Sequence, residues 1–281
     1  MDTSTVAELF DFWVDEGQYW LADNAAFLFE WLRFVFEGFY GGALAVLEFS
    51  PWFAVATIFG LLAWRIVSLS FGALTTAALA ACWAMGLWAE TMSTLALVAS
   101  ATGIALVLAL PIGVLTGFFP KLDHVVEPIL DLMQTLPPYI YLIPAIALLG
   151  FGPGTALAAT LVVAMPPAIR LTSLGIRTTP IQFVELGKST GMTPAQMFFK
   201  IRLPFAMPSI MAGINQSLMM AFGMVVIAGI VGSGGLGETI YEATRTLDIG
   251  KSIDAAIAIV ILTIVIDRLT QGLVPSRKDP R

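Results

Sequence analysis

The chain has 281 residues, of which 58% are hydrophobic and only 12% are charged, and its mean hydropathy is +0.86. Soluble domains are about half apolar and about a quarter charged, so this composition excludes an ordinary soluble protein and indicates an integral membrane protein. The single cysteine, Cys82, cannot form an internal disulfide. The single histidine, His124, excludes a multi-histidine metal site, and we expect no bound metal.

The first 42 residues differ from the rest in composition. Nine acidic residues precede position 50, against the single basic residue Arg33, so we do not expect a cleavable signal peptide, which would begin with basic residues. Acidic residues recur at seven-residue intervals on one helical face and aromatic residues line another, namely Glu16, Asp23, Glu30 and Glu37, and Trp20, Phe27, Trp31 and Phe34. The spacing predicts one or two amphipathic helices at the outer membrane interface, where tryptophan is favoured. The alternative, an additional spanning helix, would have to bury Glu30 and Arg33.

Apolar stretches of membrane-spanning length follow. A helix crosses the bilayer core with about 20 apolar residues, and the seven expected spans are 43–64, 66–89, 92–119, 126–149, 154–175, 206–231 and 252–273. We therefore expect an all-α membrane domain over 43–275 and a cytoplasmic tail over 276–281. Gly113 and Gly117 have the spacing that allows close helix contact. Prolines within the spans leave helix carbonyls unpaired, which favours a transporter over a simple anchor.

Lysine and arginine residues predict the orientation, because they remain on the cytoplasmic side of spanning helices. With the N-terminus outside, eleven of the fourteen basic residues lie in inner connections or in the tail. Only Arg33, Arg245 and Lys251 then lie outside. We therefore expect the N-terminus outside and the C-terminus in the cytoplasm.

The longest inner connection, 176–205, has the signals of a folded unit. Its "GKST" (187–190) is similar to the end of a phosphate-binding P-loop, but Gln182 stands where the first glycine belongs, so we do not expect ATP to bind there. Two threonine–proline pairs, Thr179–Pro180 and Thr193–Pro194, predict the starts of two short helices. Gly191 is expected to end the first helix in a left-handed conformation, and Leu203–Pro204 to end the second. An ordered loop with an apolar and a basic side is typical of a segment that binds a groove of another protein.

This loop resembles the signature cytoplasmic loop of bacterial ABC-importer permeases, written E-A-A, three residues, G, nine residues, I-x-L-P. The matching positions are Glu185, Gly191, Ile201, Leu203 and Pro204, while Leu186 and Gly187 replace the two alanines. Residues 90–275, including "LPFAMPSIMAGINQSLMMAFGMVVIAGIVGSGGLG" (203–237), are similar to the permeases for glycine betaine, proline betaine and choline. The resemblance implies a type I ABC importer permease fold in the bacterial inner membrane, with 180–204 as the loop that couples to an ATPase.

The resemblance also implies the partners. They are two cytoplasmic ATPase subunits, which carry the ATP and magnesium, a separate extracytoplasmic substrate-binding protein, and a second permease copy. Membrane lipid surrounds the assembly, and no nucleic acid is expected. The chain itself would bind no cofactor and would not be an enzyme. Glu185 has two alternative partners: a basic residue of the ATPase, or Lys188 or Arg202 within its own loop.

The expected cargo, a quaternary ammonium, can be held by carboxylates or by aromatic faces. Tyr139 and Tyr141 follow the prolines of the fourth expected span and are candidates for the translocation pathway; the alternative is that they only pack. An ion-coupled secondary transporter is the main alternative function and usually needs carboxylates near mid-membrane. The acidic residues instead stand at the ends of expected spans, at Glu48, Glu90, Asp131, Asp254 and Asp267. A membrane-embedded enzyme lacks a clustered set of histidine, cysteine or carboxylate side chains.

Overall fold

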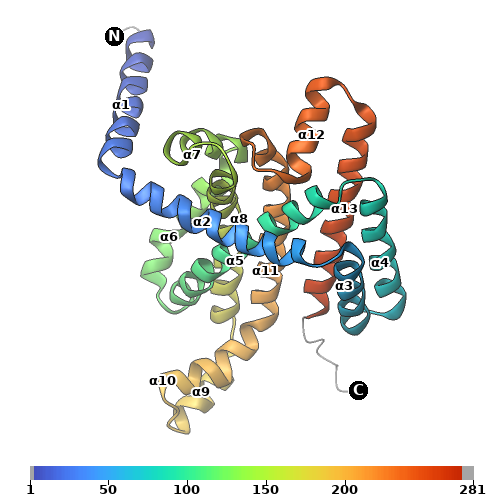
Figure 1. Ribbon diagram of the computed structural model, residues 1–281. Coiled ribbons are helices and arrows are strands. Elements are labelled where there is room, and N and C mark those ends of the chain that lie inside the picture. Colours follow the sequence, from blue (N-terminus) through green and yellow to red (C-terminus); the bar gives the residue numbers. More distant parts are fainter. Residues whose placement is uncertain (1–2, 274–281) are drawn as a thin grey trace.

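The computed structural model describes residues 3–273, with side chains described from residue 8, and all of its regular structure in that range is helical (Figure 1). The expected all-α class is confirmed. The elements are α1 (Thr3–Asn24), α2 (Ala26–Phe49), α3 (Trp52–Ile66), α4 (Leu69–Ala84), α5 (Trp88–Phe118), α6 (Pro120–Thr135), η1 (Pro138–Tyr141), α7 (Leu142–Leu149), α8 (Pro153–Arg177), α9 (Ile181–Ser189), α10 (Pro194–Met197), η2 (Phe198–Arg202), α11 (Leu203–Ala228), η3 (Gly229–Val231), α12 (Gly235–Thr246) and α13 (Ile249–Gly272).

Helices α5, α8 and α11 form the centre of the bundle, and small residues bring them together. A Cβ atom added to Gly113 would lie 2.7 Å from Thr172 Cβ, and one added to Gly117 would lie 2.8 Å from Ile176 Cβ. On the other side of α8, a Cβ on Gly213 of α11 would lie 3.1 Å from Leu171 Cβ. The expected close contact at Gly113 and Gly117 is confirmed, and van der Waals packing of this kind is the main attraction between helices in lipid.

The part of the chain that the structure describes has fewer candidate spans than the seven expected. Four helical segments are long and apolar enough to cross a membrane: α5, α8, Pro194–Val231 and α13. Two further pairs, α2 with α3 and α6 with η1–α7, pass the same test only together, so the number of spans is at most six by length and composition. The expected span 66–89 contains α4, whose 16 residues are short for a crossing.

Both bent pairs break at a proline. The expected span 43–64 contains a bend of 100° at Ser50–Pro51, and the span 126–149 contains a bend of 103° at Leu136–Pro137. A proline has no N–H for the preceding turn and pushes the residue before it out of the helical conformation. Ser50 and Leu136 have ψ angles of 142° and 137°, which are extended. The sequence therefore shows the apolar composition of both stretches, but it does not show that each one is two helices joined by a sharp bend.

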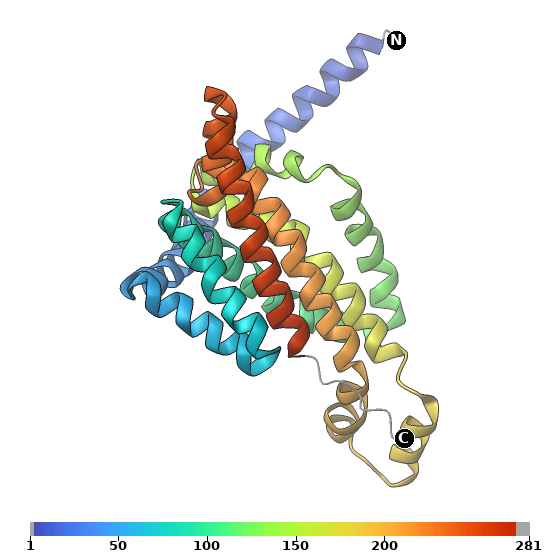
Figure 2. The ribbon, with the colours of Figure 1, turned by 90° about the vertical axis from the view of Figure 1, so that its right-hand side faces the viewer.

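The acidic N-terminal segment forms two helices, within the expectation of one or two. Helix α2 continues past the expected boundary at residue 42 and packs across α5, α7 and α8, with Phe36 buried. Helix α1 extends away from the bundle (Figure 2). Arg33 Nε binds Glu37 Oε1 at 2.7 Å, and this pair lies over the turn between α7 and α8, because a Cβ on Gly150 would be 3.1 Å from Arg33 Nη1.

The two ends of the bundle carry different elements. Helices α9 and α10 extend beyond one end, whereas α1 and α12 lie toward the other (Figures 1 and 2). Helix α12 lies in the connection between the last two expected spans, which is expected on the outer side. Its N-cap residue is Gly234, and the Gly234 N–H donates to Glu238 Oε2 at 2.7 Å. The 181–202 loop is therefore on the opposite side of the bundle from the N-terminal helix.

Candidate functional site

The candidate coupling loop begins with α9, which ends at a glycine turn as the sequence predicts. Gly191 has a φ of +74°. Its N–H donates to Lys188 O at 3.1 Å, and the Met192 N–H donates to Gly187 O at 2.9 Å. These two bonds form the Schellman pattern, which satisfies carbonyls left free at a helix end. The chain therefore reverses direction at a residue whose backbone conformation favours glycine.

The start of α10 also agrees with the sequence prediction. Thr193 is its N-cap: the Gln196 N–H donates to Thr193 Oγ1 at 3.3 Å, and the Thr193 N–H donates to Gln196 Oε1 at 3.0 Å. This reciprocal capping box satisfies two backbone donors, and Pro194 occupies the first turn, where a missing N–H does no harm. The position of the second helix is thus determined by its own sequence.

Two other boundaries of the loop differ from the prediction. Pro180, not Thr179, is the N-cap of α9, and the Thr179 hydroxyl instead donates back to Ile176 O at 3.0 Å. Leu203–Pro204 does not end the second helix, because Pro194–Val231 is continuous. The five residues of η2 form a π-helical turn in which the Leu203 N–H donates to Phe198 O. A π-turn lets a helix continue with altered pairing just before Pro204, and such turns often occur at functional sites.

The loop has a small apolar core of its own. Val184 of α9 packs with Met197 and Ile201, and the rings of Phe183 and Phe205 lie 4.8 Å apart. Gly187 is buried beside Met197, so the second of the two replaced alanine positions is a close helix contact. Leu186, at the first, is 56% exposed. The loop is therefore a folded unit whose two helices are fixed relative to each other.

Three large apolar side chains are exposed on the outer surface of the loop, among polar and charged ones. Ile181, Leu186 and Phe199 are 64%, 56% and 64% exposed, and all three lie on the elements that extend beyond the bundle. Glu185 is exposed, and within residues 8–273 it forms no ion pair with Lys188 or Arg202. The guanidinium of Arg202 instead stacks over the Phe118 ring, 4.8 Å from its centre. Of the two alternatives for Glu185, the pair within the loop is therefore not formed.

The two candidate pathway tyrosines share the η1 turn but have different surroundings. Tyr139 is 55% exposed. The Tyr141 hydroxyl donates to Met133 O at 3.2 Å, and its ring packs against the main core. Met133 O has no helical donor because the residue four positions later, Pro137, lacks an N–H. Tyr141 therefore caps the end of α6, and only Tyr139 presents its ring outward.

One polar contact inside the bundle was not predicted from the sequence. Asp267 of α13 accepts from Asn215 Nδ2 at 3.0 Å and from Gln271 Nε2 at 2.8 Å. A lone asparagine in the apolar run of α11 was the available signal, since an amide in a spanning helix needs a partner. Asp131, another of the acidic residues at the span ends, pairs with Arg170 of α8.

Comparison with known proteins identifies the family. The model described as "Binding-protein-dependent transport system inner membrane component" matches residues 109–279. The chain belongs to this family. It is 40% identical over 263 residues to the glycine betaine/proline betaine transport system permease protein ProW of Escherichia coli (strain K12), covering 94% of this chain and 74% of that protein. It is 38% identical over 269 residues to the glycine betaine transport system permease protein OpuAB of Bacillus subtilis (strain 168), covering 92% and 95%.

A solved structure is also similar. A chain of the MetNI methionine ABC transporter, in an inward-facing conformation, superposes with a TM-score of 0.57 and 26% identity, covering 64% of this chain and 91% of that chain. The family match and this likeness confirm the type I importer permease fold and the resemblance that the loop motif predicted. They also confirm an inner-membrane transport component and disfavour the ion-coupled secondary transporter.

Proposed function

We propose that the chain is the pore-forming permease subunit of an ATP-driven importer for a quaternary-ammonium solute such as glycine betaine, proline betaine or choline. The two relatives above are permeases for glycine betaine, and one of them also for proline betaine. A choline transport system permease protein, OpuBB of Bacillus subtilis (strain 168), is 36% identical over 174 residues. These names support the class of cargo, and the loop supports the source of energy.

The observation that carries this proposal is the folded loop over 181–202. It has its own core, two capped helix ends, and an exposed apolar surface made by Ile181, Leu186 and Phe199. Large apolar side chains held on a rigid turn outside the bundle fit a groove in a cytoplasmic partner. Glu185, exposed beside them, is free to accept hydrogen bonds from that partner. We assign the partner as the ATPase subunit, which binds the ATP and magnesium, so this chain needs no cofactor.

The assembly follows from the number of loops. One such loop per chain can dock one ATPase, and ATP closes two ATPases around the nucleotide, so a second permease copy completes the importer. A separate binding protein delivers the cargo at the end that carries α1 and α12. The excess of basic residues in the inner connections supports an N-terminus outside and a C-terminus in the cytoplasm.

We propose that Tyr139 and Tyr141 both serve the translocation pathway, but in different roles. The exposed ring of Tyr139 can meet a quaternary ammonium face-on, at about 0.5 to 2 kcal/mol per ring, which is weak enough for release. Tyr141 holds the end of α6 and so fixes the turn that carries Tyr139.

Two measurements test the proposal. The permease is purified in mild detergent to see whether an ATPase subunit co-purifies, and the complex is then reconstituted in liposomes with its binding protein. We expect the liposomes to take up radiolabelled glycine betaine or choline. This uptake should require ATP on the side of the membrane that the 181–202 loop faces. Uptake driven by a proton or sodium gradient without ATP would favour the secondary transporter. A complex that hydrolyses ATP but takes up neither compound would show that the cargo is another one.

A further inference from the structure

Two arginines stand where the 181–202 loop joins the bundle. The loop has two covalent connections, the segment from α8 to α9 and the continuous helix from η2 into α11. Arg177 is the last residue of α8, and Arg202 is the last residue of η2. Movement of the loop along the chain therefore passes one of these two residues, while the ring contact of Phe183 with Phe205 joins the loop to α11 directly.

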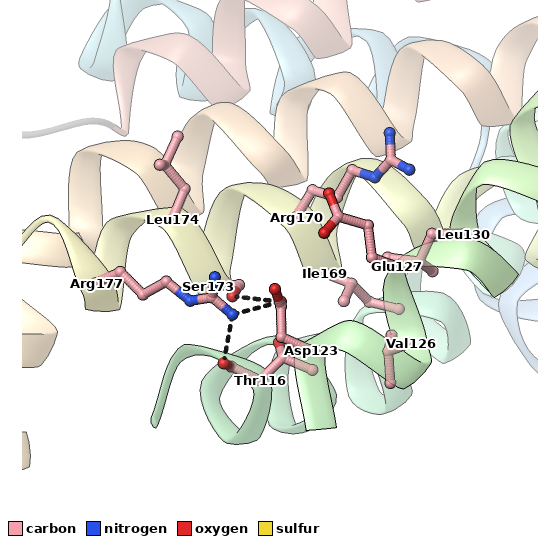
Figure 3. Close-up of a pocket in the computed structure, with 10 residues that line it drawn as sticks. All are labelled: Thr116, Asp123, Val126, Glu127, Leu130, Ile169, Arg170, Ser173, Leu174 and Arg177. Atoms are coloured by element: carbon pink, nitrogen blue, oxygen red, sulfur yellow. Dashed lines mark hydrogen bonds and ion pairs between the residues drawn. The ribbon is translucent and has the colours of Figure 1, made fainter. Parts of the chain in front are cut away.

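Arg177 binds the ends of two other helices. Its Nη2 donates to Thr116 O of α5 at 2.8 Å and lies 2.5 Å from Asp123 Oδ1 of α6, to which Ser173 also donates (Figure 3). Thr116 O has no helical donor, because the residue four positions later is Pro120, which lacks an N–H. The Asp123 side chain is only 18% exposed, so water screens this pair less than a surface pair. Arg177 thus satisfies a free carbonyl and a carboxylate at once.

Arg202 repeats the arrangement from the other connection. Its Nη1 donates to Ile176 O of α8 at 3.4 Å. This carbonyl has no helical N–H because Pro180 stands four positions later, and it accepts from the Thr179 hydroxyl as well as from Arg202. The same guanidinium stacks on Phe118 of α5, and the Phe118 ring lies 5.9 Å from Phe198 of η2. Arg202 Nε is buried without a hydrogen-bond partner in the described residues, so a small rearrangement of the π-turn would change its contacts.

Helix α6 is the element that these contacts can move. A cavity of about 260 Å³ lies between α6, α5 and α8, so α6 is not packed tightly along its whole length. Two ion pairs bridge it to α8: Arg177 with Asp123, and Arg170 with Asp131. Arg170 also donates to Gln134 at 2.9 Å, one turn before the bend that leads to η1. A shift of α8 at Arg177 would therefore pull on the segment that carries Tyr139.

We infer that Arg177 and Arg202 are positioning residues that transmit movement of the 181–202 loop to α5 and α6, with Thr116, Phe118 and Asp123 as their partners. We call these five residues the arginine junction. The inference deepens the proposed function and rests on it, since the movement is that of a loop docked on an ATPase. Hydrogen-bonded charges suit this role, because they have discrete alternative partners rather than a continuous range of contacts.

The first test does not depend on the cargo. Spin labels at the exposed positions Val125 of α6 and Ile264 of α13 are introduced with Cys82→Ser, and their separation is measured in the liposome-reconstituted complex with and without trapped ATP. We expect a shift in the wild type that is lost in Arg177→Gln and in Arg202→Gln. Arg268→Gln is the matched control, because Arg268 is exposed near the same end of the bundle and forms no ion pair within the described range. A shift unchanged in both junction variants, or absent from the wild type, would overturn the inference.

The second test separates transmission from stability. In Arg177→Gln we expect ATP hydrolysis to persist while uptake falls by about tenfold, a typical strength of coupling between sites. Exchanging the charges, Arg177→Asp with Asp123→Arg, should recover most of that uptake by restoring the ion pair. Hydrolysis and uptake lost together in a complex with a lower melting temperature, with no recovery on exchange, would show a merely structural role. If the proposed cargo is wrong, the wild type will take up neither compound, but the change in the distance between the spin labels will remain.

Discussion

Gly187 and Met197 are in contact across the two helices of the loop, so closely that a Cβ added to Gly187 would lie 2.6 Å from Met197 Cε and 3.0 Å from Ile201 Cδ1. The nearest atom is the flexible end of a methionine, which can turn aside for one methyl group. It cannot make room for a branched side chain without disturbing Ile201. Position 187 therefore sets how closely α9 lies on η2.

This contact predicts a graded response to substitution. Gly187→Ala should assemble and transport like the wild type, because alanine favours a helix over glycine by about 1 kcal/mol and offsets the displaced methionine. Gly187→Val should destabilise the loop by about 1 to 3 kcal/mol, the usual effect of overpacking, and should lose the ATPase on gel filtration. Leu186→Ala is the informative neighbour: its side chain is exposed, so the permease should keep its melting temperature yet bind the ATPase more weakly. Equal ATPase binding by all three variants would contradict the docking surface.

Gly191 predicts a second effect on the loop. Gly191→Val should disfavour the left-handed turn by about 1 to 2 kcal/mol and misdirect α10, so the permease should insert in the membrane but lose its ATPase or its transport. Gly191→Asn is the control, since asparagine tolerates this conformation, and it should retain most of the activity. Wild-type uptake by the valine variant would show that the turn is not needed.

How much of this site was predictable depends on the distance over which each signal acts. The turn at Gly191 and the cap at Thr193 were predicted because their hydrogen bonds are made within a few residues. The start of α9 was misplaced because Thr179 binds back to α8, and sequence spacing alone does not show which helix a hydroxyl will serve. The Asn215–Asp267 bond joins residues 52 apart in the chain, and no local pattern indicates such a pair.

Prolines explain most of the remaining differences. Pro120, Pro137 and Pro180 each remove the helical N–H donor of the carbonyl four positions earlier. Arg177 and Tyr141 donate to the first two of these carbonyls, and both Arg202 and the nearby Thr179 donate to the third. The sequence shows that the carbonyls are free, but only the fold shows the donors. The prolines within the spans predict unpaired carbonyls, but they do not predict that two of the expected spans bend by about 100°.

The relative positions of α9 and α12 predict the outcome of accessibility labelling. In a Cys82→Ser background, a cysteine at Thr246 of α12 should react with an impermeant thiol reagent added to intact cells, because this exposed residue lies at the end opposite the loop. A cysteine at Ser189 of α9 should react only after the cells are opened. Both positions are exposed, so a difference in reactivity reports the side of the membrane. Labelling of Ser189→Cys from outside would reverse the proposed orientation.

The two tyrosines of η1 predict separable effects on stability and transport. Removing the Tyr141 hydroxyl in Tyr141→Phe leaves Met133 O without its donor, so we expect a loss of about 1 kcal/mol of stability. Its uptake, measured at a temperature where the protein is folded, should change little. Tyr139→Ala removes an exposed ring and should leave the melting temperature unchanged, but uptake of labelled glycine betaine or choline should fall while ATP hydrolysis persists. Tyr139→Phe keeps the aromatic face and should transport normally. If uptake is instead unchanged in Tyr139→Ala, the ring does not touch the cargo, and the bend at Pro137 serves only to shape the bundle.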